Sequence, residues 1–282
     1  MQITSTMMTN AGVGAMLRAW RAKRHLSQLA LALEAEVSAR HLSFIETGRA
    51  KPSADLLLQL AERLAVPLRE RNALLNAAGF APRFPETGLS APGMTTVRDA
   101  MQRLLDAHDP YPGVALDRAW NVVLTNAAAR RMMAVLPPAL ATHAQNMFRV
   151  SLHPDGFAAF TVNFDEWGSY LLGELQQLCE SRPDPDIAAL LDEVSGYPNV
   201  RALRARNAAA KGRTGVPQPN RDHAVSALLV PCVITLGTTT LSLFTTLATI
   251  GAPRDVTLAE LTVELFYPSD GATAAALRAH SG

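Results

Sequence analysis

The stretch SARHLSFIETGRAKPS, from Ser38 to Ser53, decides how the front of this chain folds. A helix advances about 100° per residue, so a helix that begins there places Leu42 and Ile45 on one side. The other side carries Arg40, Phe44 and small hydroxyl-bearing residues. An apolar side of this kind packs against a core. The polar side is therefore left for a partner that accepts a cation, hydroxyl groups and an aromatic ring.

Further helix signals lie on both sides of this stretch. Ser27 and Ser38 are natural N-caps, the helix after Ser38 is expected to end near Gly48, and Pro52-Ser53 is a typical helix start. The apolar spacing predicts short helices over residues 15–24, 28–36, 38–48, 54–64 and 69–78.

Two short helices joined by a tight turn, the second with a polar outer side, are typical of a helix-turn-helix. The turn here is AEVS, Ala35–Ser38, and the next helix is expected in the major groove of DNA. Arginine, hydroxyl groups and an apolar ring match guanine edges, base acceptors and thymine methyl groups. Residues 14–83 hold 11 Lys and Arg against 6 Asp and Glu, a net charge of +5, and the remainder carries −4. The front of the chain is therefore predicted to bind DNA.

The segment LRAWRAKRHLSQLALALEAEVSARHLSFIETGRAKPSADLLLQLAERLAV, Leu17–Val66, resembles the Cro/C1-type (XRE) helix-turn-helix domain of phage repressors and many bacterial regulators. The resemblance implies an all-α domain, assigned to residues 14–80, that binds double-stranded DNA. Glu36 departs from the family pattern, which often has glycine in the turn. Arg21 and Glu46 match a pair that forms an internal ion pair in this family. The resemblance places the DNA contacts at Gln28, Ser38, Ala39, Arg40, Ser43, Phe44, Thr47, Arg49 and Lys51.

A second region follows a break in the pattern. Residues 81–95 are predicted to be a linker, because GFAPRFPETGLSAPGM, Gly79–Met94, is rich in proline and glycine. Beyond it, strand patterns flank a helical middle, which indicates an α+β domain with a mainly antiparallel sheet. Helices are expected at 97–107, 127–136, 165–181, 186–195, 199–210 and 272–279, strands within 111–126 and at 225–236, 239–250 and 261–267, and a polar loop at 211–222.

This second region resembles the MmyB-like transcription regulators, in which an XRE domain precedes a PAS-like ligand-binding domain. The resemblance spans nearly the whole chain and implies that residues 96–282 form a sheet with helices around an apolar cavity. The segments that carry it are YPGVALDRAWNVVLTN (Tyr111–Asn126), MFRVSLHPDGF (Met147–Phe157), VNFDEW (Val162–Trp167) and TLAELTVELFYPSD (Thr257–Asp270).

Aromatic and methionine side chains are numerous in the second region, with few polar residues between them. This composition suits an apolar or amphipathic ligand, such as a fatty-acyl-like molecule, better than a charged metabolite. For any one of these residues, a place in a plain core is the simpler interpretation. Arg149, Asn163 and Tyr170 are the candidate polar anchors. The candidate ligand-binding residues are Trp120, Met132, Phe148, Phe160, Trp167, Tyr170 and Phe244.

Three functions are compatible with the second region: an effector sensor, a domain used only for dimerisation or protein contact, and an enzyme. The seven histidines are scattered, and the sequence lacks HExxH, GxSxG and P-loop motifs. Cys179 and Cys232 lack metal-ligand spacing, so no cofactor, no metal and no enzymatic activity are expected. The apolar runs are too short to span a membrane. The sequence thus predicts a cytoplasmic, homodimeric, effector-sensing DNA-binding regulator.

Overall fold

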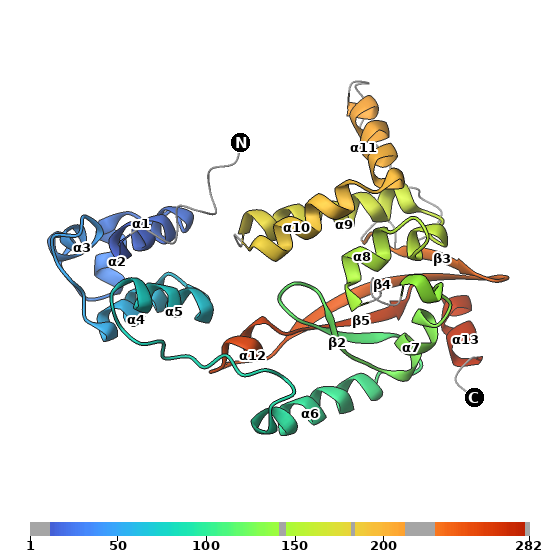
Figure 1. The fold of residues 1–282 in the computed structure, drawn as a ribbon, viewed down its shortest axis with the longest axis horizontal. Coiled ribbons are helices and arrows are strands. Elements are labelled where there is room, and N and C mark those ends of the chain that lie inside the picture. The colour runs from blue at the N-terminus through green and yellow to red at the C-terminus, as the bar shows by residue number, and fades with distance from the viewer. Residues whose placement is uncertain (1–11, 141–144, 182–183, 212–228, 280–282) are drawn as a thin grey trace. The chain divides into compact units, whose positions relative to one another are not determined.

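The computed structural model describes residues 12–140, 145–181, 184–211 and 229–279. The chain divides into two compact units, which Figure 1 colours along the sequence. The N-terminal unit combines Met1–Gly88 with Ile250–Ala259, and the C-terminal unit combines Leu89–Thr249 with Glu260–Gly282. A short segment between two strands of the C-terminal unit therefore belongs to the N-terminal unit.

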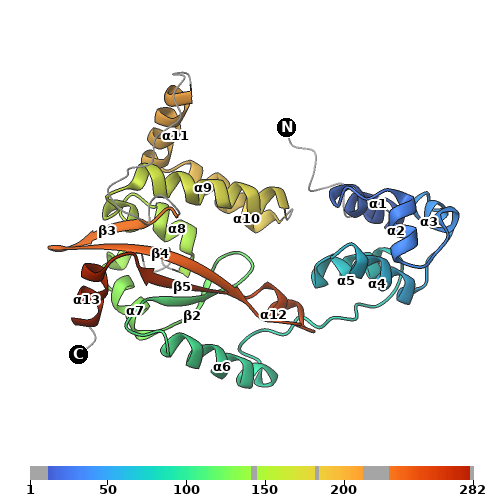
Figure 2. The ribbon, with the colours of Figure 1, turned by 180° about the vertical axis from the view of Figure 1, so that it is seen from behind.

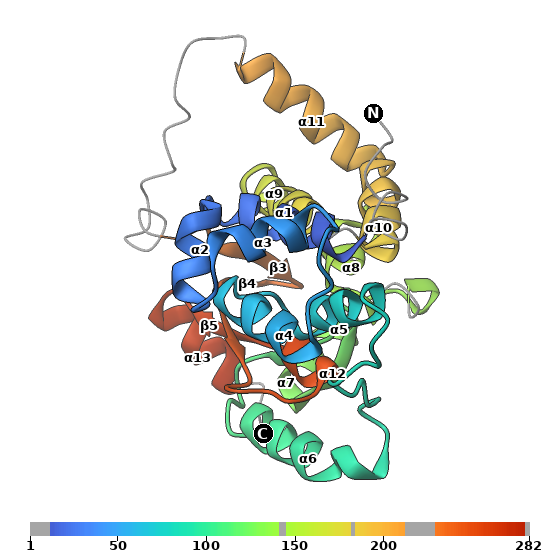
Figure 3. The same ribbon diagram turned by 90° about the vertical axis from the view of Figure 1, so that its left-hand side faces the viewer.

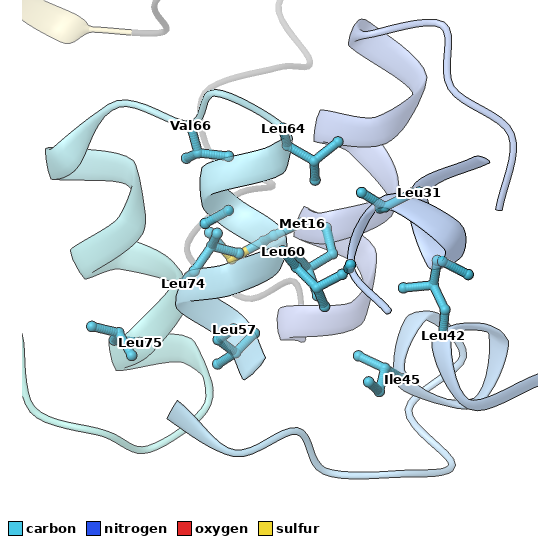
Figure 4. Close-up of a cluster of buried hydrophobic side chains, with 14 residues drawn as sticks. Met16, Leu31, Leu42, Ile45, Leu57, Leu60, Leu64, Val66, Leu74 and Leu75 are labelled. Carbon is cyan, nitrogen blue, oxygen red and sulfur yellow. The ribbon is translucent and has the colours of Figure 1, made fainter. Parts of the chain in front are cut away.

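The described residues before Gly88 form short helices around one leucine-rich core (Figure 4). Leu31, Leu42 and Leu60 are fully buried there, as their helical spacing predicts. The all-α helix-turn-helix character of this region is confirmed. The helices are α1 (Val13–Lys23), α2 (Gln28–Glu34), α3 (Ala39–Glu46), α4 (Ala54–Arg63) and α5 (Leu68–Ala77).

The predicted helix starts and stops are confirmed. The hydroxyl oxygens of Ser27, Ser38 and Ser53 each accept a hydrogen bond from the backbone N–H three residues later, at 3.0, 3.1 and 3.2 Å. Gly48 and Gly79 follow α3 and α5 with φ of 74° and 86°. Glycine adopts this left-handed conformation without steric penalty, and it allows the chain to leave a helix sharply.

The turn between α2 and α3 contains a left-handed residue that is not glycine. Glu36 has a φ of 54°, at the position where the family pattern often has glycine. The turn keeps its backbone hydrogen bonds. Glu36 N–H donates to the Leu33 carbonyl at 3.2 Å, and Val37 N–H donates to the Ala32 carbonyl at 2.9 Å. The departure thus leaves the turn intact, at a backbone cost of about 1–2 kcal/mol.

The C-terminal unit is built on an antiparallel sheet of five strands in its described part, in the order β2-β1-β5-β4-β3. The strand β5 lies inside the sheet and pairs with β1 on one side and β4 on the other. The predicted α+β class with an antiparallel sheet is confirmed. The strands are β1 (Gly113–Leu116), β2 (Val122–Thr125), β3 (Cys232–Leu236), β4 (Thr239–Thr249) and β5 (Thr262–Pro268).

Helices lie on both sides of this sheet. Figures 1, 2 and 3 all show α9 and α10 along one side and α6 along the other. The PAS-like description of this unit rests on the resemblance and stays a prediction. The α-helices of this unit, apart from two short ones described next, are α6 (Thr95–Asp106), α7 (Ala127–Met133), α9 (Phe164–Ser181), α10 (Pro185–Ser195), α11 (Pro198–Lys211) and α13 (Gly271–Ala279).

Two short helices were not expected from the sequence: α8 (Met147–Leu152) and α12 (Val256–Glu260). Both are too short to show a helical period, and each starts at a polar side chain that accepts backbone N–H bonds, Asn146 and Asp255. The expected strand over 225–236 is described only from residue 229 and is extended from Cys232. The expected polar loop at 211–222 lies outside the described residues, apart from Lys211 in α11.

Candidate functional site

The helix α3 has one buried and one exposed side. Leu42 and Ile45 have no exposed surface and belong to the leucine core. Arg40 is exposed and Phe44 is half-buried, and the guanidinium carbon of Arg40 lies 5.4 Å from the centre of the Phe44 ring. This cation–π contact holds the two most distinctive predicted base contacts together on the open side of the helix.

The smaller predicted contacts of α3 also have roles within the helix. The hydroxyl of Ser38 caps its start, and Ala39 packs partly against the core. The hydroxyl of Thr47 donates to the carbonyl of Ser43 at 2.8 Å. These residues therefore shape the exposed side of α3, and their contact with DNA stays a prediction.

Basic side chains extend the exposed surface beyond α3. Arg49 and Lys51 follow the helix directly and are both exposed. Cations at such positions are typical phosphate contacts, which fix the register of a protein on DNA without reading bases. Arg40, Arg49 and Lys51 are thus exposed cations in and just after α3, as the net charge of +5 predicts for a region that binds DNA.

A buried carboxylate ties α1, α2 and α3 together. Glu46 is only 7% exposed and accepts hydrogen bonds from Nε and Nη2 of Arg21, at 2.6 and 2.8 Å. The amide nitrogen of Gln28 donates to the same carboxylate at 2.7 Å. Burial acts to raise the pKa of Glu46, but the bonds from Arg21 and Gln28 outweigh it and leave the pKa lowered. The predicted ion pair is confirmed, and the amide nitrogen of Gln28 is occupied within the protein.

An apolar cavity of about 60 Å³, called the inner cavity below, lies within the C-terminal unit. One water needs about 10–15 Å³ by this measure, so the space admits a short chain or a small ring. Its walls come from the sheet and from α7, α8 and α9. The lining residues are Pro112, Val114, Trp120, Ala129, Met132, Met133, Met147, Phe148, Ser151, Phe157, Trp167, Leu171, Cys232, Ile234, Leu243, Glu264 and Phe266.

Four of the seven candidate ligand-binding residues line the inner cavity: Trp120, Met132, Phe148 and Trp167. They come from four separate parts of the chain, so only the fold brings them together. Phe160 lines a second hollow of about 320 Å³, which Met132 also borders and which extends to α13.

The other two candidates lie outside the linings of both hollows. Tyr170 is 37% exposed, and its ring centre lies 5.2 Å from that of Trp167. Phe244 stacks on Tyr267 with 5.5 Å between ring centres. Of these two ring partners, Trp167 lines the inner cavity and Tyr267 does not. Contact of Tyr170 and Phe244 with a ligand stays a prediction.

Trp120, which lines the inner cavity, has a strained backbone conformation that surrounding hydrogen bonds impose. Its φ of 65° is uncommon for a bulky residue. The carboxylate of Asp117 accepts hydrogen bonds from the N–H groups of Ala119 and Asn121, both at 2.9 Å, and Met147 N–H donates to the Trp120 carbonyl at 3.0 Å. Strain of this kind persists only where surrounding bonds impose it, and it occurs often at ligand sites.

Glu264 is the ionisable carboxyl group in the wall of the inner cavity. It is 6% exposed, and its Oε2 atom is buried without a hydrogen-bond partner among the described residues. Burial raises the pKa of Glu264 to about 7, although a hydrogen bond with Thr245 acts in the opposite direction. The sequence contained one signal that was missed: in the strand TVELFYP, period-two alternation places Glu264 on the same face as Phe266.

The side chains predicted as polar anchors are used inside the protein. Arg149 on α8 pairs with Glu193 on α10, with 2.7 Å between Nη2 and Oε2. Asn163 donates to the carbonyl of Pro231 at 2.8 Å and accepts from Val233 N–H at 3.0 Å. The Arg149 pair joins α8 to α10, and the Asn163 bonds join the start of α9 to the edge strand β3. Glu264 is the carboxylate in the lining of the cavity.

Two further observations concern the described residues only. Within those ranges, His, Cys, Asp and Glu side chains form no group of three or more that could hold a metal ion. Across the same part of the chain, no helix is both long enough and apolar enough to cross a membrane.

Comparisons with known proteins assign both parts of the chain. The model of the MmyB-like transcription regulator ligand binding domain matches residues 97–279, more than half of the chain, and a helix-turn-helix model matches residues 17–71. A search of curated proteins finds no match. The inner cavity lies within the first match and α3 within the second. The chain therefore belongs to the MmyB-like transcription regulators, DNA-binding proteins that combine an XRE-type helix-turn-helix with a ligand-binding domain.

Proposed function

We propose that this regulator recognises a specific DNA sequence through α3 and alters that binding when a small apolar or amphipathic effector occupies the C-terminal unit. The observation that carries the proposal is the inner cavity. It is apolar apart from Glu264, Ser151 and Cys232, and it lies in the region matched by the ligand-binding family model. Ligand sites commonly combine apolar walls with a few polar groups.

The DNA-binding half of the proposal rests on the exposed side of α3. Arg40 and Phe44 contact each other there. Arg49 and Lys51 follow shortly after the end of α3 and are both exposed. A single helix-turn-helix reads a half-site, and two copies on a symmetric operator supply useful affinity. We therefore propose a homodimer formed largely through residues 96–282.

Coupling between effector and DNA needs a connecting part whose conformation both sites influence. The stretch before Leu89 is fastened within the N-terminal unit. Asn72 on α5 accepts hydrogen bonds from the N–H groups of Arg83 and Phe84, at 3.0 and 3.1 Å, and donates to the Phe84 carbonyl at 2.7 Å. The backbone at Arg83 and Phe84 is thus hydrogen-bonded to a helix of the DNA-binding unit.

The segment that connects β4 to β5 holds the same stretch. The carboxylate of Asp255 accepts a hydrogen bond from Thr87 N–H at 3.1 Å, and Val256 N–H donates to the Pro85 carbonyl at 2.8 Å. A change in the positions of β4 and β5 would therefore act on the linker through its covalent connection to Asp255. This supports the linker as the part through which an effector alters DNA binding.

The test first identifies a small molecule that co-purifies with the protein, by native mass spectrometry. It then measures binding of the full chain to a selected operator with and without that molecule. Trp167→Ala should reduce the effect of the ligand on DNA affinity and leave the ligand-free affinity unchanged, because Trp167 lines the cavity and lies outside the matched helix-turn-helix. Leu104→Ala, on the exposed side of α6, is the control. Identical DNA affinity with and without bound ligand would contradict the sensor and favour a domain used only for dimerisation.

The oligomeric state is tested separately. Light scattering of the full chain at micromolar concentration should give the mass of a dimer. A monomer at that concentration would contradict the homodimer, without affecting the assignment of α3 as the DNA-reading helix.

A further inference from the structure

We infer that Glu264 is the polar anchor of the inner cavity and that it selects an apolar effector with a cationic amine head group over one that carries a carboxylate. This inference rests on the proposed effector-sensing function and specifies the chemistry of that same site. It changes the expected ligand, since a fatty-acyl-like carboxylate is the molecule that a buried glutamate disfavours.

The first argument is the incomplete hydrogen bonding of Glu264. Its Oε2 atom is buried and has no partner among the described residues, while the residue as a whole is 6% exposed. Most buried polar atoms in proteins have partners, and each exception calls for an explanation. A ligand atom that donates a hydrogen bond from the cavity would supply the missing partner.

The second argument is the charge of the cavity wall. None of the described lining residues is Lys, Arg or His, so a ligand carboxylate would meet no cation and would lie near Glu264. An ammonium group would instead form a charge-assisted hydrogen bond with the carboxylate, which is stronger than one between neutral groups. Because the surrounding residues are apolar, water competes little with such a pair.

The third argument is the position of Glu264 on β5. The strand is paired on both edges, so that Glu264 lies opposite Val114 on β1 and opposite Leu247 on β4. Phe266, two residues later, lines the same cavity. A rigid strand therefore holds the carboxylate in place, and an apolar body bound against Phe266 would place its head group near Glu264.

Two groups have pKa values that respond to the charge of Glu264, and both are shifted away from neutral pH. Burial and the nearby Glu264 charge raise the pKa of Cys232, on β3, to about 12. Burial and the charges of Glu174 and Glu264 raise the pKa of Tyr170, on α9. His108 contacts the Phe266 carbonyl oxygen through Nε2 at 2.8 Å but does not line the cavity. A change in binding between pH 6 and pH 8 that is much larger for an amine than for an alcohol is therefore assigned to Glu264, whose pKa lies at about 7.

The experiment compares three probes that share one alkyl chain: n-hexylamine, n-hexanol and n-hexanoate, with calorimetry on the full chain at pH 8. We expect hexylamine to bind about tenfold more tightly than hexanol, and hexanoate to bind most weakly. Glu264→Gln keeps the shape and removes the charge, so it should abolish the preference for the amine and weaken hexanol binding much less than hexylamine binding, because glutamine still accepts a hydrogen bond. Glu180→Gln, at an exposed position on α9, removes one charge elsewhere and should leave the preference intact.

A measurement on the unaltered protein keeps the test independent of whether Glu264→Gln folds. Between pH 6 and pH 8 the ionised fraction of Glu264 rises from about a tenth to about nine tenths, so hexylamine affinity should rise about tenfold while hexanol affinity changes much less. Equal binding of all three probes, or tightest binding of hexanoate, would overturn the role of Glu264 and leave the cavity as a ligand site. Binding of none of them would contradict the sensing function itself for this cavity, and the inference with it.

Discussion

The two units of this regulator each bury one glutamate to almost the same extent, and they treat it in opposite ways. Glu46 in the helix-turn-helix is surrounded by donors from Arg21 and Gln28, and its pKa is lowered. Glu264 in the ligand-binding unit retains a buried oxygen without a partner among the described residues, and its pKa is raised to about 7. Low exposure alone therefore does not set the direction in which the pKa of a carboxyl group shifts. The hydrogen-bond donors around the group also decide it.

This contrast matches where each unit is proposed to meet its partner. Among the described residues of the DNA-binding unit, no buried side-chain nitrogen or oxygen lacks a hydrogen-bond partner, and the proposed DNA contacts lie on the exposed side of α3. In the ligand-binding unit the proposed contacts line the inner cavity, where Glu264 keeps a buried oxygen without a partner among the described residues. Four predictions test the contrast, from the largest expected effect to the smallest.

Arg21→Ala should lower the free energy of unfolding of the helix-turn-helix by about 3–5 kcal/mol, because it leaves the buried carboxylate of Glu46 without its main partner. The pKa of Glu46 is lowered in the folded state, so its contribution is present above the unfolded pKa and disappears as the pH falls. The deficit of the variant should therefore shrink on acidification. Calorimetric unfolding of the full chain between pH 3 and pH 8 measures both effects.

Arg63→Ala, at an exposed position near the end of α4, serves as the control and should leave the transition within about 0.5 kcal/mol of the parent. If Arg21→Ala unfolded at the temperature of the parent protein at pH 7, the ion pair would have no stabilising role and the contrast with Glu264 would disappear.

Glu264→Gln should change stability with the opposite dependence on pH. A carboxyl group whose pKa rises from 4.5 to about 7 on folding makes the folded protein lose about 3 kcal/mol as the pH increases across that range. The glutamine variant lacks this loss, so its stability relative to the parent should increase from pH 4.5 to pH 7 and then level off. Denaturant unfolding at several pH values tests this, and parallel stability profiles for the two proteins would contradict it.

Arg40→Ala should weaken specific DNA binding by about 1–3 kcal/mol and relax the preference at one or two base positions. Lys51→Ala should instead weaken binding to all sequences alike and reduce its salt dependence, because a phosphate contact carries no sequence information. Competition binding with operator and random duplexes at two salt concentrations separates the two outcomes. If Arg40→Ala matched the parent on both duplexes, α3 would not be the reading helix.

Glu36→Gly should stabilise the helix-turn-helix by about 1 kcal/mol, because glycine adopts the φ of 54° without strain. The matched control is Glu34→Gly, two residues earlier and still in α2, where the same replacement should destabilise by about 1 kcal/mol. Equal effects at the two positions, measured by thermal unfolding, would show that the turn tolerates glutamate without cost.

The sequence by itself determined the helix-turn-helix almost completely. Helix caps and stops act over three or four residues, so neighbouring residues in the sequence are sufficient to predict them. This holds for the caps at Ser27, Ser38 and Ser53 and for the stops at Gly48 and Gly79. The Arg21–Glu46 pair spans 25 positions and was predicted only because the motif resembled a known family. The element order of the second region was also predictable from its period-two and helical patterns, apart from the short α8 and α12.

Only the tertiary structure decided which aromatic residues share a cavity and which polar group faces it. Trp120 and Trp167 meet there because the pairing of β1 with β5 and the packing of α9 bring distant segments together, whereas Phe244 points toward Tyr267. Period-two alternation places Glu264 on the face of Phe266, but it does not show that the carboxyl group is buried and short of donors, and Asp255 is an ordinary loop aspartate in the sequence. Desolvation and missing donors depend on every neighbour in space, which is the physical reason that no local pattern of residues could reveal them.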